Sequence, residues 1–260
     1  MPRYSLSLGY FFTHVPLVER LQKAVAAGFH AVEMFWPAQV DSGDLERARA
    51  QANVEVVLFN MNEGDYRAGD RGFACVPDRL PWWRAELSRA LLLADKIDCR
   101  RINVLAGKIP DQASRTRFLD CFVENLRWAA PQAAAAGVQL VVEPLNHLSH
   151  PDGLCQRTVD VIEVLDLVME PNVGLQYDVY HAQRSEGNII DTIREHIGRI
   201  MHVQIADVPT RSCPGSGELN FPAILATLDA LNYKGYVGLE YIPPHPPVDP
   251  FGWLRQLSRE

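Results

Sequence analysis

The sequence predicts a single closed barrel of alternating parallel strands and helices, a (β/α)8 TIM barrel covering residues 1–260. Its length is close to the ~250 residues typical of that fold. Short apolar runs alternate with helix-length stretches along the whole chain, which implies a parallel sheet. No shift in composition marks a linker, so we expect one domain.

The first half of the chain alternates regularly except for one long loop. The third apolar run is β-branched and short enough to be a strand buried on both faces. The segment from Asn60 to Pro81 exceeds an ordinary strand-to-helix connection, and such loops often act as lids or bind substrate. We expect strands at Ser5–Leu8, Ala31–Met34, Val54–Phe59 and Arg101–Leu105, and helices at Leu17–Ala27 and Trp82–Ile97.

The second half continues the alternation. Ser114–Ala136 has the pattern of a long amphipathic helix, which Pro131 should kink or break. The segment Pro243–Pro247 can form neither a helix nor a paired strand. Further helices are expected at Thr158–Met169, Ile189–His196, Pro222–Leu231 and Pro250–Leu257.

Composition narrows the class of protein. The net charge is −7 and no basic block is present, which disfavours a nucleic-acid partner. Five scattered cysteines without a Cys-x-x-Cys pair argue against an oxidised scaffold. No signal peptide is apparent, and no run approaches the ~18 apolar residues of a membrane span. We therefore expect a cytoplasmic protein that does not bind membranes.

Four apolar runs in the second half end in a polar side chain that can bind a metal: Glu143, Asp178, Gln204 and Glu240. The separations of 35, 26 and 36 residues each suit one strand, one helix and two loops. Side chains at the carboxyl ends of parallel barrel strands converge where such barrels keep their chemistry. Three crowded carboxylates would repel one another without a cation. The oxygen donors favour Mg²⁺ or Mn²⁺ over Zn²⁺.

Two of these residues, Glu143 and Glu240, should face each other across the barrel mouth. Two glutamates on opposite sides of a substrate can remove a proton from one carbon and deliver it to the next. The metal would hold the substrate oxygens and stabilise the intervening enediolate. Helix capping is the alternative for Glu143 and for Asp178. His202, on the same side of its strand as Gln204, is expected to be buried and hydrogen-bonded one layer below.

Several motifs resemble the hydroxypyruvate isomerase branch of the xylose-isomerase-like barrels. The resemblance covers nearly the whole chain. It implies that Glu143 and Glu240 are the acid and base, that these two with Asp178 and Gln204 hold the metal, and that His181 and Arg211 contact substrate oxygens. Ketose 3-epimerases of the same superfamily have a histidine in place of Gln204. The motifs are Glu143-Pro144-Leu145-Asn146, Gln176-Tyr177-Asp178-Val179-Tyr180-His181, the segment from His202 to Arg211, and Gly238-Leu239-Glu240-Tyr241.

One short segment departs from the pattern of that branch. Leu148 and Ser149 stand where the branch has an Arg-Asp pair. If that arginine binds a substrate carboxylate, another basic residue must replace it here. We expect Arg71 on the long loop to do so, with Lys108 and His147 as other candidates.

Both substrate-binding arginines have alternative roles. Arg71 could instead pair with Asp65 or Asp70 and only shape its loop, and Arg211 could pair with Asp207 or Glu218.

The expected activity is a metal-assisted aldose–ketose type isomerisation of a small 2-oxo or hydroxy acid. Conversion of hydroxypyruvate to tartronate semialdehyde is the example that the resemblance supplies. A ketose 3-epimerase or a polyol dehydratase on the same scaffold is the alternative. A sugar-binding module without turnover is disfavoured, because unused buried carboxylates would cost stability. The exact substrate, the metal and the oligomeric state stay open, with a homo-oligomer as one option.

Overall fold

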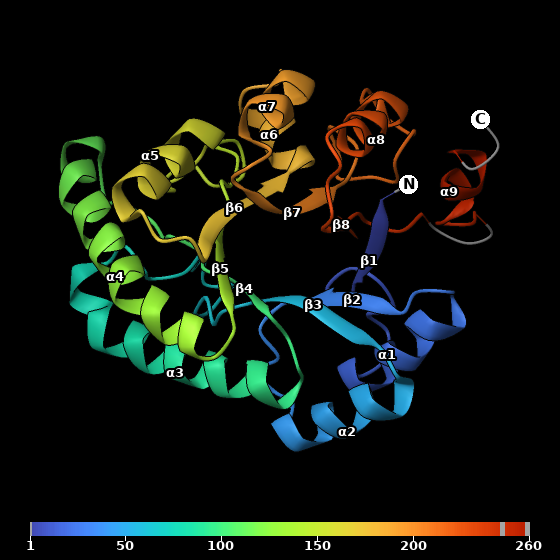
Figure 1. Ribbon diagram of the computed structural model, residues 1–260, viewed down its shortest axis with the longest axis horizontal. Helices are drawn as coiled ribbons and strands as arrows, with labels where there is room; N and C mark the ends of the chain where they lie inside the picture. Colours follow the sequence, from blue (N-terminus) through green and yellow to red (C-terminus); the bar gives the residue numbers. More distant parts are fainter. Residues whose placement is uncertain (1, 245–247, 258–260) are drawn as a thin grey trace.

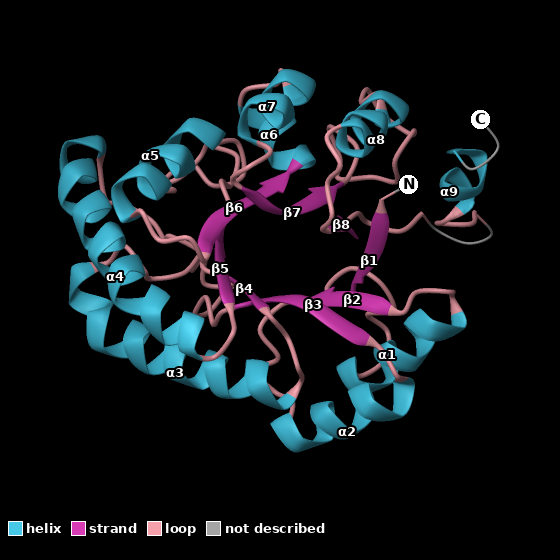
Figure 2. Cartoon of the chain, viewed as in Figure 1, coloured by secondary structure: helices cyan, strands magenta, loops and turns pink. Residues whose placement is uncertain are grey.

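The computed structural model, which describes residues 2–244 and 248–257, confirms the closed (β/α)8 barrel. Every strand pairs in parallel with its neighbours, and β8 closes the ring against β1. Figures 1 and 2 show the strands around a central axis with the helices outside them. The strands are β1 (Arg3–Ser7), β2 (Ala31–Met34), β3 (Glu55–Asn60), β4 (Arg101–Asn103), β5 (Gln139–Val142), β6 (Val173–Asp178), β7 (Ile200–Ile205) and β8 (Tyr236–Leu239).

The helices alternate with the strands, and β6 is followed by two of them. In Figure 1, α9 lies on the outer ring beyond β1, where the ring of Trp253 packs edge-on against Tyr4 with centroids 6.1 Å apart. Within the described residues, no helix is both long and apolar enough to cross a bilayer. The helices are α1 (Leu17–Ala26), α2 (Ser42–Ala52), α3 (Leu80–Lys96), α4 (Arg115–Ala135), α5 (Thr158–Val168), α6 (Val179–Ser185), α7 (Ile189–His196), α8 (Phe221–Ala230) and α9 (Gly252–Leu257).

Two features of the helices differ from the sequence-based expectation. Helix α4 continues through Pro131 without a break. Proline removes one helical hydrogen bond, but the surrounding buried face, which includes Leu126, Ala129 and Ala133, packs into the core and holds the helix. The long loop is also shorter than expected, because a 3₁₀ turn at Pro77–Arg79 leads directly into α3.

The interior of the barrel is polar near the strand ends that carry the expected site. Apolar residues such as Leu140 and Val203 are buried on the strands, as expected for a parallel sheet covered on both faces. Buried polar side chains stand among them, and Glu33 on β2 contacts His202 and Gln204 on β7 across the lumen. These side chains are Ser5, Ser7, Glu33, Asn60, Asn103, Gln176, His202 and Gln204. The predicted segment Pro243–Pro247 lies partly outside the described residues.

Candidate metal and substrate site

The four strand-end residues converge at the carboxyl end of the barrel. Glu143 and Glu240 each follow directly after a strand, Asp178 ends β6, and Gln204 lies on β7 beside Asp178 in the strand register. All four are buried, with exposures of 6% or less. Both glutamates line a pocket of about 280 Å³ that His181, Arg211 and loop residues also line. Both glutamates therefore line one pocket, and Asp178 and Gln204 lie at the same end of the barrel.

Asp178 has two roles in the structure. It is the N-cap of α6, where Oδ1 accepts a hydrogen bond from the Tyr180 amide at 2.8 Å. Its other oxygen, Oδ2, lies 2.9 Å from the guanidinium of Arg211. Capping and a place in the site are thus compatible, since each uses a different oxygen.

Arg211 lies among the carboxylates, not at the surface. Its Nη2 is 2.6 Å from Glu240 Oε2 and its Nε donates to the Glu240 carbonyl at 3.0 Å. The side chain is 12% exposed. The guanidinium therefore provides positive charge between Asp178 and Glu240.

The loop after β7 brings Arg211 to this place, and Asp207 organises that loop. The fully buried Asp207 carboxylate accepts hydrogen bonds from the amides of Val208, Gly215, Gly217 and Leu219 at 2.8 to 3.1 Å. The carboxylate is thus committed to the backbone. The alternative in which Arg211 pairs with Asp207 is wrong.

His181 is buried and held in one tautomer by Asn146. The Asn146 backbone amide donates to His181 Nδ1 at 2.9 Å, and the Asn146 side-chain amide is 2.8 Å from the same atom. Nδ1 is therefore the acceptor, and Nε2 carries the hydrogen of the neutral ring. Nε2 lies 2.9 Å from Nη1 of Arg211, which can only donate. Two donor nitrogens thus face each other without an acceptor between them, and a ligand oxygen that contacts both would provide one.

Ser149, one of the two departures from the family pattern, supports this arrangement. Its amide and its hydroxyl donate to Asn146 Oδ1 at 3.1 and 2.9 Å, which leaves the Asn146 side-chain nitrogen facing His181. Leu148 is 60% exposed and makes no comparable contribution. Sequence reasoning missed Asn146, although its place three residues after Glu143 offered a signal.

The carboxylates raise one another's proton affinity. Burial, followed by the nearby charges of Glu240 and Asp178, raises the pKa of Glu143 well above its usual value. Burial raises the pKa of Glu240 to about 8, and Arg211 opposes that shift. Burial also raises the pKa of Asp178. Burial alone would lower the pKa of Arg211, but Glu240 and Asp178 raise it. The site therefore holds more negative groups than its one guanidinium balances.

The donor set fits a divalent cation bound through oxygen. Ligand atoms of Glu143, Asp178 and His181 lie within 4.8 Å of one another. Because His181 Nδ1 accepts hydrogen bonds from Asn146, the ring hydrogen lies on Nε2, and neither ring nitrogen is free to bind a metal. Another oxygen must therefore complete the set of metal ligands. The Gln204 side chain, adjacent to Asp178 in the sheet, offers a neutral oxygen.

Basic groups form another part of the pocket wall, which we call the basic wall. The Arg71 guanidinium stacks on the Tyr66 ring at 3.6 Å, and its Nη1 donates to the backbone carbonyls of Tyr66 and Asp70 at 3.1 and 2.6 Å. Asp70 Oδ2 accepts from the Asp65 amide at 2.9 Å. Arg71 also lines the pocket. The Arg71 guanidinium thus both stabilises the loop and forms part of the pocket wall.

Lys108 extends this basic wall, and His150 lies beside it. Both line a small cavity next to the main pocket, together with Arg71 and Glu143. Burial and then the charges of Arg71, Arg211 and Lys108 lower the pKa of His150 to about 4. The positive potential implied by that shift favours an anionic group at this end of the pocket.

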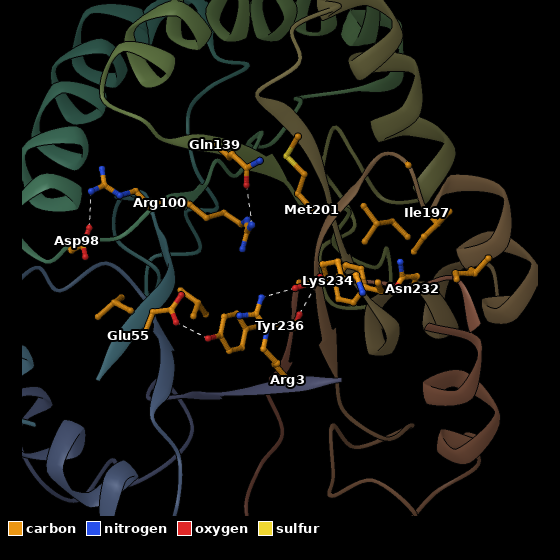
Figure 3. Close-up of a pocket in the computed structure, with 18 residues that line it drawn as sticks. Arg3, Glu55, Asp98, Arg100, Gln139, Ile197, Met201, Asn232, Lys234 and Tyr236 are labelled. Carbon is orange, nitrogen blue, oxygen red and sulfur yellow. Dashed lines mark hydrogen bonds and ion pairs between the residues drawn. The ribbon is translucent and has the colours of Figure 1, made fainter. Parts of the chain in front are cut away.

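A larger hollow of about 610 Å³ lies at the opposite end of the barrel (Figure 3). It is lined by the first residues of several strands, including Arg3, Glu55 and Tyr236. The polar groups there pair with one another: Tyr236 Oη donates to Glu55 Oε2 at 2.5 Å, and Arg100 pairs with Asp98 at 2.6 Å. Residues at this end of such barrels usually serve stability. The candidate site is therefore the smaller pocket.

Comparison with known proteins agrees with this geometry. Residues 21–257 match the family described as xylose isomerase-like TIM barrel. The chain is 38% identical to a 2-oxo-tetronate isomerase of Cupriavidus necator, with 98% of each chain covered. It is 35% identical to the hydroxypyruvate isomerase of Escherichia coli, with 94% of each covered.

Among solved structures, the crystal structure described as AP endonuclease, family 2, from Brucella melitensis is 36% identical. It superposes with a TM-score of 0.94 over 98% of this chain and 99% of that one. The chain therefore belongs to the xylose isomerase-like TIM barrel family, in its hydroxypyruvate and 2-oxo-tetronate isomerase branch.

Proposed function

We propose that the chain is an isomerase of a small sugar acid, interconverting a 2-oxo-3-hydroxy acid and its 2-hydroxy-3-oxo partner. The observation that carries the proposal is the pair of buried glutamates, Glu143 and Glu240, lining one pocket in a barrel of this family. Relatives named for hydroxypyruvate and for 2-oxo-tetronate indicate the substrate class. Both names denote 2-oxo acids of three or four carbons.

The two glutamates would move one proton between adjacent carbons. In its ionised form one glutamate removes the proton from C3, and the C2 carbonyl oxygen takes up the electron pair as an enediolate forms. The other glutamate, protonated, delivers a proton to C2, while the proton of the C3 hydroxyl passes to the C2 oxygen, so that C3 becomes the carbonyl and C2 carries the hydroxyl. The raised pKa values of Glu143 and Glu240 support this division, because a carboxyl that holds a proton near neutral pH can act as an acid.

Glu143, Asp178, Gln204 and Glu240 would hold a Mg²⁺ or Mn²⁺ ion. When bound, such an ion would supply positive charge for the oxygens on the two reacting carbons. His181 Nε2–H and the Arg211 guanidinium would donate to those same oxygens. The contact between His181 Nε2 and Arg211 Nη1 supports this role, since a substrate oxygen would provide an acceptor for both nitrogens.

The carboxylate of the substrate would bind at the basic wall. Arg71 offers a planar fork that matches two carboxylate oxygens, and Lys108 and His150 lie beside it. This arrangement would replace the arginine that other members of the branch place where this chain has Leu148. It also orients the substrate, with its acid end toward the loop and its reacting carbons toward the glutamates.

The test is turnover of hydroxypyruvate and 2-oxo-tetronate with added Mn²⁺ or Mg²⁺. Glu143→Gln and Glu240→Gln should keep the fold and each lose ~10²–10⁴-fold in kcat. Glu86→Gln is the matched control, because Glu86 is equally buried but bonds to Asn62 and Arg89 away from the pocket. If either glutamine variant kept near-normal turnover, that glutamate would be a metal ligand and not a proton carrier. Loss of turnover in Glu86→Gln alone would refute the assignment.

A 3-epimerase is the second candidate, since it could use the same two glutamates. Turnover in heavy water separates the two reactions. The isomerase places deuterium at the carbon that changes from carbonyl to hydroxyl-bearing carbon. The epimerase returns a ketose with deuterium at C3 and inverted configuration, and that result would overturn the proposed reaction.

A further inference from the structure

We propose that Glu33 is a positioning residue that turns the Gln204 side chain so that its oxygen faces the metal. This inference rests on the proposed function, because it concerns the fourth ligand of that site. Glu33 lies on β2, across the barrel from Gln204 on β7, and 169 residues separate it from its other partner, His202.

Glu33 is surrounded by donors. Its carboxylate is 1% exposed and accepts from Ser5 Oγ at 2.9 Å. His202 Nε2 lies 2.8 Å from Oε2, and Gln204 Nε2 donates to Oε1 at 2.7 Å. His202 is fully buried, and its Nδ1 has no partner among the described residues. The carboxylate is therefore the one acceptor that all three side chains share.

This arrangement fixes the orientation of the Gln204 amide. A carboxylate that accepts three hydrogen bonds offers no donor, so a reversed amide would set the Gln204 oxygen against a carboxylate oxygen. The amide nitrogen must face Glu33, and the oxygen must face the other way. There it accepts from Gln176 Nε2 at 2.6 Å and retains a second lone pair. Register pairs Gln204 with Asp178, so the side chain that carries this lone pair is a direct neighbour of a proposed ligand in the sheet.

The backbone is shaped around this contact at three points. The pairing of β2 with β3 shifts register between Val32 and Glu33, and that of β6 with β7 shifts between Leu175 and Gln176. Such irregularities re-aim side chains next to active sites. Gly238 on β8 leaves room for the carboxylate, because a Cβ there would overlap both Glu33 oxygens. The chain thus accommodates Glu33 through the irregular pairing of β2 with β3 and of β6 with β7, and through the glycine on β8.

A purely structural role is the competing explanation, and a double-mutant cycle on metal binding separates the two. The measurement is Mn²⁺ affinity by calorimetry, with the melting temperature of each variant as a check on folding. Glu33→Gln should weaken Mn²⁺ binding about 10–100-fold, the usual cost of losing a partner of a ligand.

In a chain that carries Gln204→Glu, the effect of Glu33→Gln should reverse. Two carboxylates would then oppose each other at positions 33 and 204, and Glu33→Gln relieves them by donating to the new ligand. The double variant should therefore bind Mn²⁺ more tightly than Gln204→Glu alone. That comparison also stands if Glu33→Gln alone does not fold. Ser5→Ala, which removes a donor to Glu33 without affecting Gln204, should stay within about threefold of wild type.

The outcomes distinguish this inference from the proposed function. If wild-type protein binds Mn²⁺ but the effect of Glu33→Gln has the same sign with Gln204 and with Glu at that position, Glu33 is only structural and the inference fails. If wild-type protein does not bind Mn²⁺ at all, the proposed metal site fails and the inference fails with it. If Glu33→Gln weakens Mn²⁺ binding in the wild-type background but strengthens it beside Gln204→Glu, and the melting temperatures are retained, the result supports both the metal site and the role of Glu33.

Discussion

Replacement of Arg211 by alanine should have opposite effects on metal and substrate. The guanidinium lies 2.9 Å from Asp178 Oδ2 and 2.6 Å from Glu240 Oε2, within the group of side chains proposed to hold the cation. It therefore neutralises these carboxylates in the metal-free protein and repels a cation that approaches them. Arg211→Ala should weaken substrate binding but strengthen metal binding.

The magnitudes follow from the geometry. Removing one partner of a buried ion pair costs about 3–5 kcal/mol. A domain of this size loses roughly 2–4 °C per kcal/mol, so the metal-free variant should melt at least about 6 °C lower. Two unit charges 4 Å apart interact by about 4 kcal/mol at an effective dielectric constant of 20. Because Arg211 can move when a cation binds, we expect about tenfold tighter Mn²⁺ binding, which is about 1.4 kcal/mol.

The assay is calorimetric Mn²⁺ titration with melting curves in chelator and in saturating Mn²⁺. Saturating Mn²⁺ should raise the melting temperature of Arg211→Ala by more than it raises that of the wild-type protein. Arg184→Ala is the matched control, since Arg184 also stacks on Tyr180 but donates to the Pro209 carbonyl. Unchanged or weaker Mn²⁺ affinity in Arg211→Ala would show that the cation does not bind among these carboxylates.

Two further predictions concern the basic wall and the effect of pH. Arg71→Ala should raise KM more than about tenfold for a 2-oxo acid but little for a neutral ketose of similar size, and equal effects in steady-state kinetics would exclude the carboxylate role. Metal-free protein should lose stability between pH 6.5 and 8, because the folded carboxyl of Glu240, with its pKa near 8, binds its proton more tightly than the unfolded one. Below pH 6.5 the lowered pKa values of His150 and His181 should offset much of this fall, because the raised pKa values of Glu143 and Glu240 act in the opposite direction. Melting temperatures across this range, with and without Mg²⁺, check the sign: a rise toward pH 8 in chelator would contradict it, and Mg²⁺ should flatten the fall.

The sequence was sufficient to predict the barrel and the end of it that carries the site. Strands buried on both faces give continuous apolar runs, so the polar residue that ends each run is conspicuous, as at Glu143 and Glu240. Helix α2 was not assigned because it is polar, with Leu45 as its buried residue, although Asp41 caps it through the amides of Gly43 and Asp44. Helix α6 was also missed, because it follows Asp178 with no intervening loop.

Contacts between distant segments could not be predicted. Glu33 lies in a four-residue strand with no local sign of its role, and its partners are on β1 and β7. Asp207 appeared to be a partner for Arg211, whereas the fold commits it to four backbone amides. Asp207 lies within the segment from His202 to Arg211 that motif reasoning identified, yet the motif did not give its partner. Its partner depends on loop closure and strand register, which one sequence does not specify.

The polar layer beneath the site explains how this barrel tolerates so many buried polar groups. Each unpaired buried polar group costs about 1–3 kcal/mol, so a charged ligand at the barrel mouth needs supporting partners deeper in the lumen. Here Ser5, Glu33, His202, Gln204 and Gln176 form one connected set across four strands. Because every strand contributes its side chain in a fixed register, moving one strand by a residue would disrupt the whole set. The same hydrogen bonds that pair most of these buried groups therefore hold Gln204, one of the proposed ligands, in place, and fold stability and site geometry should be lost together when this layer is broken.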